Sequence, residues 1–341
     1  MISFASDYLE GAHPLILQKL LEANPEQFPG YGEDRICAAA RDRLREAAEL
    51  PDAEIYFLSG GTQANRVVIS ALLRPYEGVI AAESGHIAAH EAGAIEAGGH
   101  KVLTLPSHAG KLDAQELRDL LRRFYRDANH AHMVFPGMVY LSWPTEYGTL
   151  YGKEELRQLY ILCREYGIPL FIDGARLGYG LGSPAAELTL PELAQSCDVL
   201  SVGGTKMGAL LGEALLFTNR RAPVQFPTQM KQQGALLAKG WAIGIQFNVL
   251  FSDRLYWRLG RHGVEMAERM KEIFRAKGYT FYLESPTNQQ FLLLDEETLA
   301  RLRPKVGFSL WEAADETHSI VRFATSWATK EQSLEKLREI L

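Results

Sequence analysis

The feature that most constrains the fold is a regular alternation of short apolar runs and helical patterns between residues 54 and 218. Strands separated by helices favour right-handed crossovers and a mostly parallel sheet with helices on both faces. We therefore predict an α/β, doubly wound architecture for this part of the chain. The predicted strands are 54–58, 78–82, 100–105, 133–142, 168–172, 198–202 and 213–218, and the predicted helices are 62–73, 87–97, 113–126 and 153–166.

The flanking segments follow other patterns. Residues 1–30 look irregular apart from one helix, and after residue 278 short strands replace the helical pattern, which indicates a smaller α+β domain. We expect a large domain over residues 1–250 and a small C-terminal domain over 251–341, joined by a long helix. The predicted elements are helices 14–23, 35–49, 234–251, 253–277 and 330–341 and strands 279–283, 290–294 and 320–323.

Two of the predicted strands end in side chains that suit one kind of chemistry. Lys206 follows an apolar run and two glycines, so its amine is poorly solvated, has a lowered pKa and can form a Schiff base with a carbonyl. Taken alone, however, Lys206 could also be an ordinary lysine at a strand end, with its amine extending into solvent. Asp173 ends another apolar run, where an acid could pair with the pyridinium nitrogen of pyridoxal phosphate.

A glycine turn between a strand and a helix supplies the third part of the set, in residues 54–65. Backbone N–H groups at a helix N-terminus bind phosphate, although an ordinary strand-to-helix turn has the same pattern. A nucleoside-triphosphate loop is excluded because Thr205, not glycine, precedes Lys206, and no G-x-G-x-x-G supports a nicotinamide site. The candidate phosphate ligands are Gly61, Thr62 and Gln63.

Four motifs in this order resemble the low-specificity L-threonine aldolase family: Gly60–Asn65, Asp173–Arg176, Gly203–Lys206 and Val321–Ser326. These are pyridoxal-phosphate enzymes of the aspartate-aminotransferase fold (fold type I), also grouped with β-eliminating lyases. The resemblance extends over nearly the whole chain. It implies pyridoxal 5'-phosphate on Lys206 and retro-aldol cleavage of L-threonine or a related β-hydroxy-α-amino acid to glycine and an aldehyde. It also implies a homodimer or homotetramer with sites between subunits.

The resemblance assigns a role to two histidines. His86 matches the histidine that stacks on the cofactor ring, and His90 lies near the substrate hydroxyl. From the residues alone, two histidines four apart could also bind a metal, but no third ligand follows at a familiar spacing. Many relatives carry a histidine where this chain has Thr145 and Glu146, so the general base could be Glu146, a water, His86 or His90.

Further residues are assigned to the substrate and to the phosphate. Arg322 lies between apolar neighbours and its fork of donors suits a carboxylate, so the resemblance makes it the clamp for the substrate carboxylate, assisted by Arg176. Ser6 belongs to a segment that reaches the active site in the family. Lys231 lies in a stretch that reaches the phosphate of the adjacent subunit, although the family usually has arginine there.

The composition argues against some classes of binding partner but does not decide between several reactions. The net charge of −6 is spread along the chain without a basic block, so we expect no nucleic-acid partner and no membrane partner. Three cysteines without metal spacing and a start without a signal-peptide pattern indicate a cytoplasmic protein. The alternatives to the aldolase are a β-eliminating lyase, a racemase or aminotransferase, and a non-catalytic binding module of the same fold.

Overall fold

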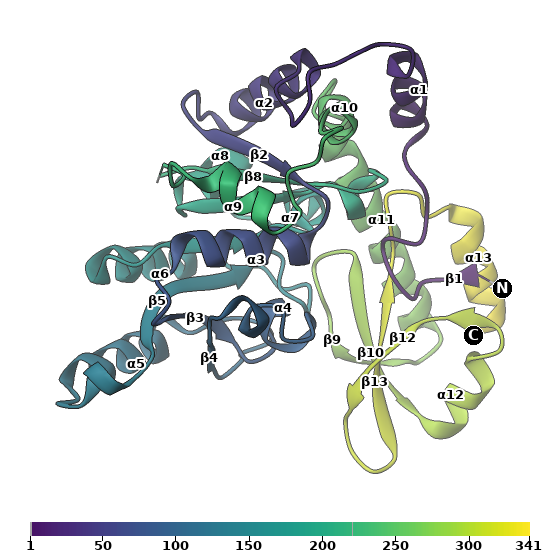
Figure 1. The fold of residues 1–341 in the computed structure, drawn as a ribbon. Helices are drawn as coiled ribbons and strands as arrows, with labels where there is room; N and C mark the ends of the chain where they lie inside the picture. The colour runs from purple at the N-terminus through teal and green to yellow at the C-terminus, as the bar shows by residue number, and fades with distance from the viewer. Residues whose placement is uncertain (1, 220) are drawn as a thin grey trace.

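The computed structural model describes residues 2–219 and 221–341, and it confirms the doubly wound α/β architecture (Figure 1). The central sheet has seven strands, and six of them run in one direction while β8 is antiparallel to both of its neighbours. Every strand predicted between residues 54 and 218 is present. The sheet order is β2 (Glu54–Leu58), β8 (Glu213–Phe217), β7 (Val199–Gly203), β6 (Leu170–Asp173), β5 (Phe135–Ser142), β3 (Glu77–Ala82) and β4 (Val102–Leu105).

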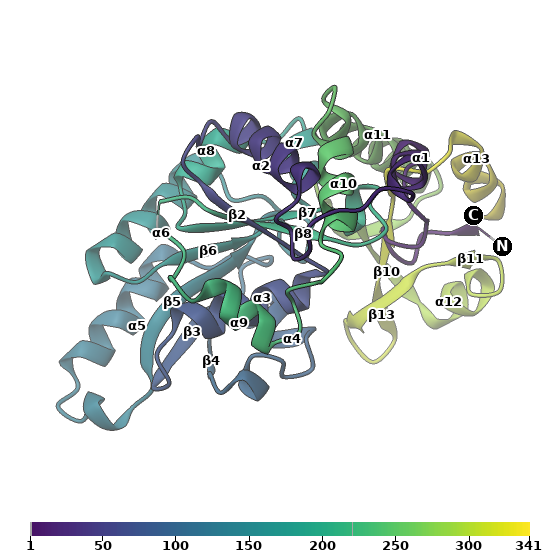
Figure 2. The same cartoon turned by 45° about the horizontal axis from the view of Figure 1, so that its top comes forward.

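Helices cover both faces of this sheet, so its strands bury side chains on two sides (Figure 2). Successive residues of a strand point to opposite faces. Ile80 and Val139 accordingly pack into one apolar cluster, whereas Val79 and Met138 pack into the other. The first cluster is covered by α2 (Arg35–Ala48), α5 (Ala114–Arg126), α6 (Lys153–Tyr166), α8 (Leu190–Gln195) and α10 (Trp241–Leu250), and the second by α3 (Gly61–Leu72) and α9 (Phe226–Gln232).

The C-terminal part forms an antiparallel four-stranded sheet with its own apolar core. The two-residue strand β1 (Ile2–Ser3) lies beside this sheet and pairs with β11 (Val306–Gly307), so the start of the chain packs against its end (Figure 1). Within the described residues, no helix combines the length and apolar content that crossing a membrane requires. The sheet order is β12 (Ser309–Ala313), β13 (His318–Ala324), β10 (Gln289–Asp295) and β9 (Thr280–Leu283), and the helices are α11 (Leu255–Ala276), α12 (Glu296–Leu302) and α13 (Glu331–Ile340).

The prediction of one helix over residues 87–97 was wrong. The helix α4 (His86–Ala89) is a single turn, and a separate 3-10 turn follows at η1 (Glu96–Gly98). Ala92 and Gly93 between them have φ angles of 50° and 70°, which a right-handed helix does not allow. The chain therefore turns directly after His90.

The predicted helix over residues 234–251 begins later, at Trp241, because Gly234 has a φ of 70°. Several short elements were not predicted, since a helix of six or seven residues has too few turns to show a periodicity. Helix α1 (Pro14–Ala23) was predicted with the correct ends. The elements that were missed are β1, β11, β12, α7 (Leu177–Gly182), α8, α9 and α12.

Glycines allow α7 and α11 to lie against each other. A Cβ built on Gly260 would overlap the carbonyl oxygen of Gly178, and one on Gly182 would overlap the backbone of Arg261. Only glycine therefore permits this approach of the two helix backbones. Because α7 begins directly after Arg176, the contact joins the long helix α11 to the sheet edge that carries Asp173.

The close approach of α7 and α11 predicts a stability change. In Gly260→Ala the added methyl group has to displace the backbone of α7, so we expect the free energy of unfolding to fall by about 1–3 kcal/mol in urea titrations. Gly11→Ala is the control, because a Cβ at Gly11 meets nothing within 4 Å. Equal stability of the two variants would contradict the role given to this contact.

Candidate active site

Three turns meet at one edge of the central sheet because the strands before them run in the same direction. The turn after β2 carries Gly60 and Gly61, β6 ends at Asp173, and β7 is followed by Lys206 in the 3-10 turn η3 (Thr205–Met207). Ligands bind at this edge in sheets of this type. The structure thus brings together the three features that the sequence placed at strand ends.

The turn that carries Lys206 is held by two buried tyrosines. The Tyr179 hydroxyl donates to the Lys206 carbonyl at 2.6 Å, and the Tyr256 hydroxyl donates to the Gly203 carbonyl at 3.0 Å. Burial lowers the pKa of the Lys206 ammonium, and the positive charge of Arg176 lowers it further, against the attraction of Asp7, Glu213 and Asp173. Lys206 therefore gives up its proton more easily than a lysine in water.

Asp173 is buried and is held as an anion by donors on one helix, one strand and the turn that follows β6. Its Oδ2 accepts from Asn65 Nδ2 at 2.9 Å and from the Tyr140 hydroxyl at 2.8 Å, and its Oδ1 accepts from the Ala175 N–H at 2.9 Å. Burial raises the pKa of this carboxyl, but His86, the Asn65 and Tyr140 donors and Lys206 together hold it below the usual value. The site thus contains a fixed negative charge beside a lysine.

A chain of contacts connects Asp173 to the histidines. Asn65 Nδ2 also donates to Glu91 Oε1 at 2.8 Å, and the same oxygen lies 2.7 Å from His86 Nδ1. Glu91 therefore fixes the orientation of the His86 ring through its Nδ1. The centre of the His90 ring lies 5.8 Å from that of His86 and 5.4 Å from that of Trp311, in strand β12 of the small domain.

The loop after β5 supports the histidines from the other side. Glu146 Oε1 accepts from the backbone N–H of His86 at 2.9 Å and from the Ser142 hydroxyl at 2.5 Å. Burial raises the pKa of the Glu146 carboxyl. Among the described residues, no group of three or more histidine, cysteine, aspartate and glutamate side chains is arranged to hold a metal ion. Glu146 thus fixes the backbone of His86 from the loop after β5.

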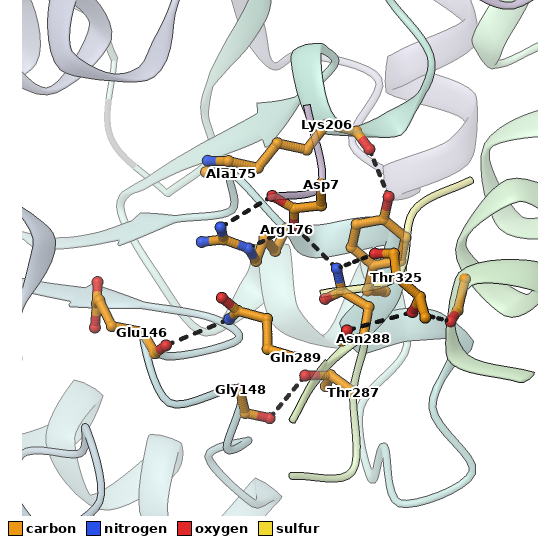
Figure 3. A network of polar contacts seen from close by, with 12 residues as sticks. Asp7, Glu146, Gly148, Ala175, Arg176, Lys206, Thr287, Asn288, Gln289 and Thr325 are labelled. Atoms are coloured by element: carbon orange, nitrogen blue, oxygen red, sulfur yellow. Dashed lines mark hydrogen bonds and ion pairs between the residues drawn. The ribbon is translucent and has the colours of Figure 1, made fainter. Parts of the chain in front are cut away.

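Arg176 forms a buried ion pair with Asp7. Its Nε and Nη2 donate to Asp7 at 2.7 and 3.0 Å, and Asn288 donates to the same carboxylate at 2.9 Å. Figure 3 shows Lys206 extending past this pair. The role of Asp7 was missed, since its sequence neighbours suggest only a turn cap. Ser6 beside it is buried, and its hydroxyl has no hydrogen-bond partner in the structure.

Arg322 lies in β13, across the site from the central sheet. Nη1 donates to Gln289 at 3.0 Å, Nη2 donates to the Ala5 carbonyl at 3.2 Å, and the guanidinium lies 5.0 Å from the centre of the Trp311 ring. Its Nε is buried without a partner. Burial lowers the pKa of Arg322 to about 10, so it stays charged at neutral pH. One donor of a buried cation therefore remains available to a ligand.

The N-terminus of α3 is open to a ligand. Gly60 precedes the helix without a side-chain cap, and a Cβ at Gly60 or Gly61 would meet nothing within 4 Å. Thr62 follows in the first turn, whereas Gln63 turns its amide oxygen back to the Ser59 hydroxyl at 2.7 Å. Lys231 lies in α9, with its Nζ 4.6 Å from the centre of the Tyr31 ring.

Comparison with known proteins identifies the family of this site. The family described as beta-eliminating lyase matches residues 3–297. A low specificity L-threonine aldolase of Pseudomonas aeruginosa is 33% identical over 99% of this chain and 95% of the relative. A solved threonine aldolase of Leishmania major is 42% identical and has a TM-score of 0.96. The match covers 100% of this chain and 98% of the Leishmania chain. A histidinol-phosphate aminotransferase of Clostridium acetobutylicum, 14% identical with a TM-score of 0.75, shares the fold, with 100% of this chain and 98% of that chain covered.

The ion pair of Asp7 and Arg176 predicts a dependence of stability on pH. Burial raises the pKa of Asp7, but Arg176 and Lys206 outweigh it and lower that pKa to about 2. The stabilisation is thus present above the unfolded pKa near 4 and is lost as the pH falls to about 2. Between pH 4 and pH 2 we expect the wild type to lose about 2 kcal/mol more unfolding free energy than Asp7→Asn. Asp42→Asn, which changes an exposed carboxylate, should follow the wild type, and parallel curves for all three proteins would contradict this assignment.

Proposed function

The chain belongs to the beta-eliminating lyase family, and on that premise we propose that it cleaves L-threonine and related β-hydroxy-α-amino acids to glycine and an aldehyde. One observation carries the proposal: Lys206, the ionised Asp173 and the partly unpaired Arg322 line one site in a chain that matches threonine aldolases over its full length. The enzyme is a lyase that uses pyridoxal phosphate.

The residues of the site fit this cofactor. The uncapped N-terminus of α3 offers backbone N–H groups to a phosphate, and the missing side chains of Gly60 and Gly61 leave room for it. Asp173 suits a protonated ring nitrogen because its own donors keep it charged. When bound, pyridoxal phosphate supplies an aldehyde for amines and a ring that withdraws electrons from the substrate α-carbon.

Lys206 and Asp173 have complementary tasks in this proposal. Lys206 holds the cofactor through its Nζ, which burial and Arg176 keep ready to lose a proton. Asp173 holds the proton on the ring nitrogen, because a buried carboxylate favours a positive charge beside it. Tyr140 and Asn65 keep the carboxylate oriented, and His86, anchored by Glu91, would lie against the ring.

The substrate carboxylate is assigned to Arg322. Its unpaired Nε and its burial favour an anionic partner, and a charged hydrogen bond in such a place is strong. Arg176 adds a second positive charge, and Asp7 fixes the position of this guanidinium. The unpaired hydroxyl of Ser6 lies in the same segment as Asp7. The carboxylate would thus lie between the two domains.

We assign removal of the β-hydroxyl proton to His90. Burial lowers the pKa of this imidazole, and the charges of His86, Arg322 and Arg176 lower it further, so it is neutral and able to accept a proton at pH 7. The same two arginines are proposed to attract the substrate, which places His90 near the bound molecule. Glu146 is a positioning group in this scheme, because its Oε1 is engaged by Ser142 and by the backbone of His86.

We also propose a homodimer or homotetramer with sites between subunits, working in the cytoplasm. Helix α1 presents exposed Leu15, Leu17 and Leu21, and large exposed apolar side chains favour association. Lys231, on the surface of α9, would then approach the phosphate of an adjacent subunit. The cysteines Cys37, Cys163 and Cys197 are free and buried. Free cysteines suit a reducing compartment.

Product analysis tests the reaction. Purified protein loaded with pyridoxal phosphate should convert L-threonine to equal amounts of glycine and acetaldehyde, and Lys206→Ala should abolish turnover. A β-eliminating lyase, which the family description also favours, would instead release ammonia and a 2-oxo acid. Release of ammonia without glycine would therefore contradict the aldolase proposal and show that the reaction is a β-elimination. Full activity of Lys206→Ala would remove the assigned role of the lysine.

Replacement of Arg322 tests the binding of the substrate carboxylate. In Arg322→Gln one charged hydrogen bond is lost, so we expect KM for L-threonine to rise about 10- to 100-fold with a smaller change in kcat and unchanged cofactor binding. Arg338→Gln, on the exposed helix α13, is the matched control and should behave as the wild type. Loss of cofactor with an unchanged KM would contradict this assignment.

A further inference from the structure

One buried carboxyl at the sheet edge acts on Lys206 through its charge but has no assigned role in the site. Glu213 is the first residue of β8, the antiparallel strand between β2 and β7. In the sheet register it lies opposite Leu58 on one side and Gly203 on the other. Leu58 is the last residue of β2 before the turn of Gly60 and Gly61, and Gly203 is the last residue of β7 before Lys206. Glu213 thus lies between the two turns.

One carboxyl oxygen of Glu213 has no hydrogen bond. The side chain is buried, with 3% of the residue exposed, and Oε2 has no hydrogen-bond partner. The hydroxyl of Ser201, which the register places on the same face of the sheet, and that of Thr205 lower the pKa of the carboxyl by hydrogen bonding. A buried carboxyl with an unpaired oxygen costs stability, so a role in the chemistry of the site explains its presence better than a role in folding.

The charges around Glu213 make it a proton partner of Lys206. Burial raises the pKa of the carboxyl to about 8, and Lys206 acts in the opposite direction while Asp173 adds to the rise. The Tyr256 phenol is the other titratable group that faces it, and burial keeps that phenol protonated. The opposite charges of Lys206 and Glu213 therefore make the protonation of each group depend on that of the other.

We propose that Glu213 is a positioning residue that takes up the proton which Lys206 releases when its amine binds the cofactor, an inference that rests on the proposed role of Lys206. The exchange conserves atoms and charge: the ammonium loses one N–H bond, the carboxylate gains one O–H bond, and the net charge of the pair stays zero. No base from outside the site is needed. The carboxylate returns the proton when the amine is released.

The test compares Glu213→Gln with Glu54→Gln. Both remove one carboxylate from the same pair of strands, and Glu54 lies opposite Phe217, at the other end of this pair from Glu213. In cofactor-free protein, acetylation of Lys206 by acetic anhydride is followed against pH by peptide mass analysis. Loss of the carboxylate makes the ammonium less stable, so the midpoint for Lys206 should move to lower pH by roughly one unit in Glu213→Gln. Glu54→Gln should match the wild type.

Further measurements make the result decisive. In the loaded enzyme, the pH at which the visible absorbance of the lysine-bound cofactor changes should move in the same direction. An unchanged midpoint in a folded Glu213→Gln protein would overturn the proposal. If that variant does not fold, Glu213→Asp replaces it, since it withdraws the carboxyl by one methylene group and should also lower the midpoint. Borohydride reduction of the wild type distinguishes the cofactor role of Lys206 from the role of Glu213. If reduction does not add the mass of the cofactor to Lys206, only the cofactor role of Lys206 is refuted.

Discussion

The common direction of β2, β5, β6 and β7 is the constraint on which the rest of the site depends. Residues far apart in the sequence reach one edge because each follows a strand that ends there, and β8 can be reversed without changing this. The apolar side chains on both sheet faces fix the strands in register, so the polar groups at their ends have little freedom. The positions of Asp173 and Lys206 are therefore a consequence of core packing.

Hydrogen bonds then convert these positions into a defined pattern of charge. Asn65 connects Asp173 to Glu91, and Glu91 holds His86, so one amide joins the acid at the end of β6 to the histidines beside α4. A buried network of this kind is stable only when nearly every member has a partner. Arg322 Nε and the Ser6 hydroxyl are among the buried groups without a partner, and we assign these two to a bound ligand.

The sequence was sufficient to predict the strand order along the chain, the ends of most long elements and the meeting of Asp173 with Lys206, because these depend on local apolar patterns. It was not sufficient for contacts between distant segments. Asp7 and Glu213 were missed since nothing in their neighbourhood reveals the partner, which lies 169 residues away for Asp7. The helix expected over residues 87–97 was wrong because the backbone at Ala92 adopts a rare conformation that no local pattern announces.

The amino-terminal segment has a consequence for how the molecule is made. Ile2 pairs with Val306, and the carbonyl of Ala5 accepts from Arg322, so this segment can dock only after Val306 and Arg322 have been synthesised. The ribosome releases a chain in order, and the large sheet can form before this segment finds its partner. The side of the candidate site that Trp311 and Arg322 form is therefore added only after the strands of the central sheet have been synthesised.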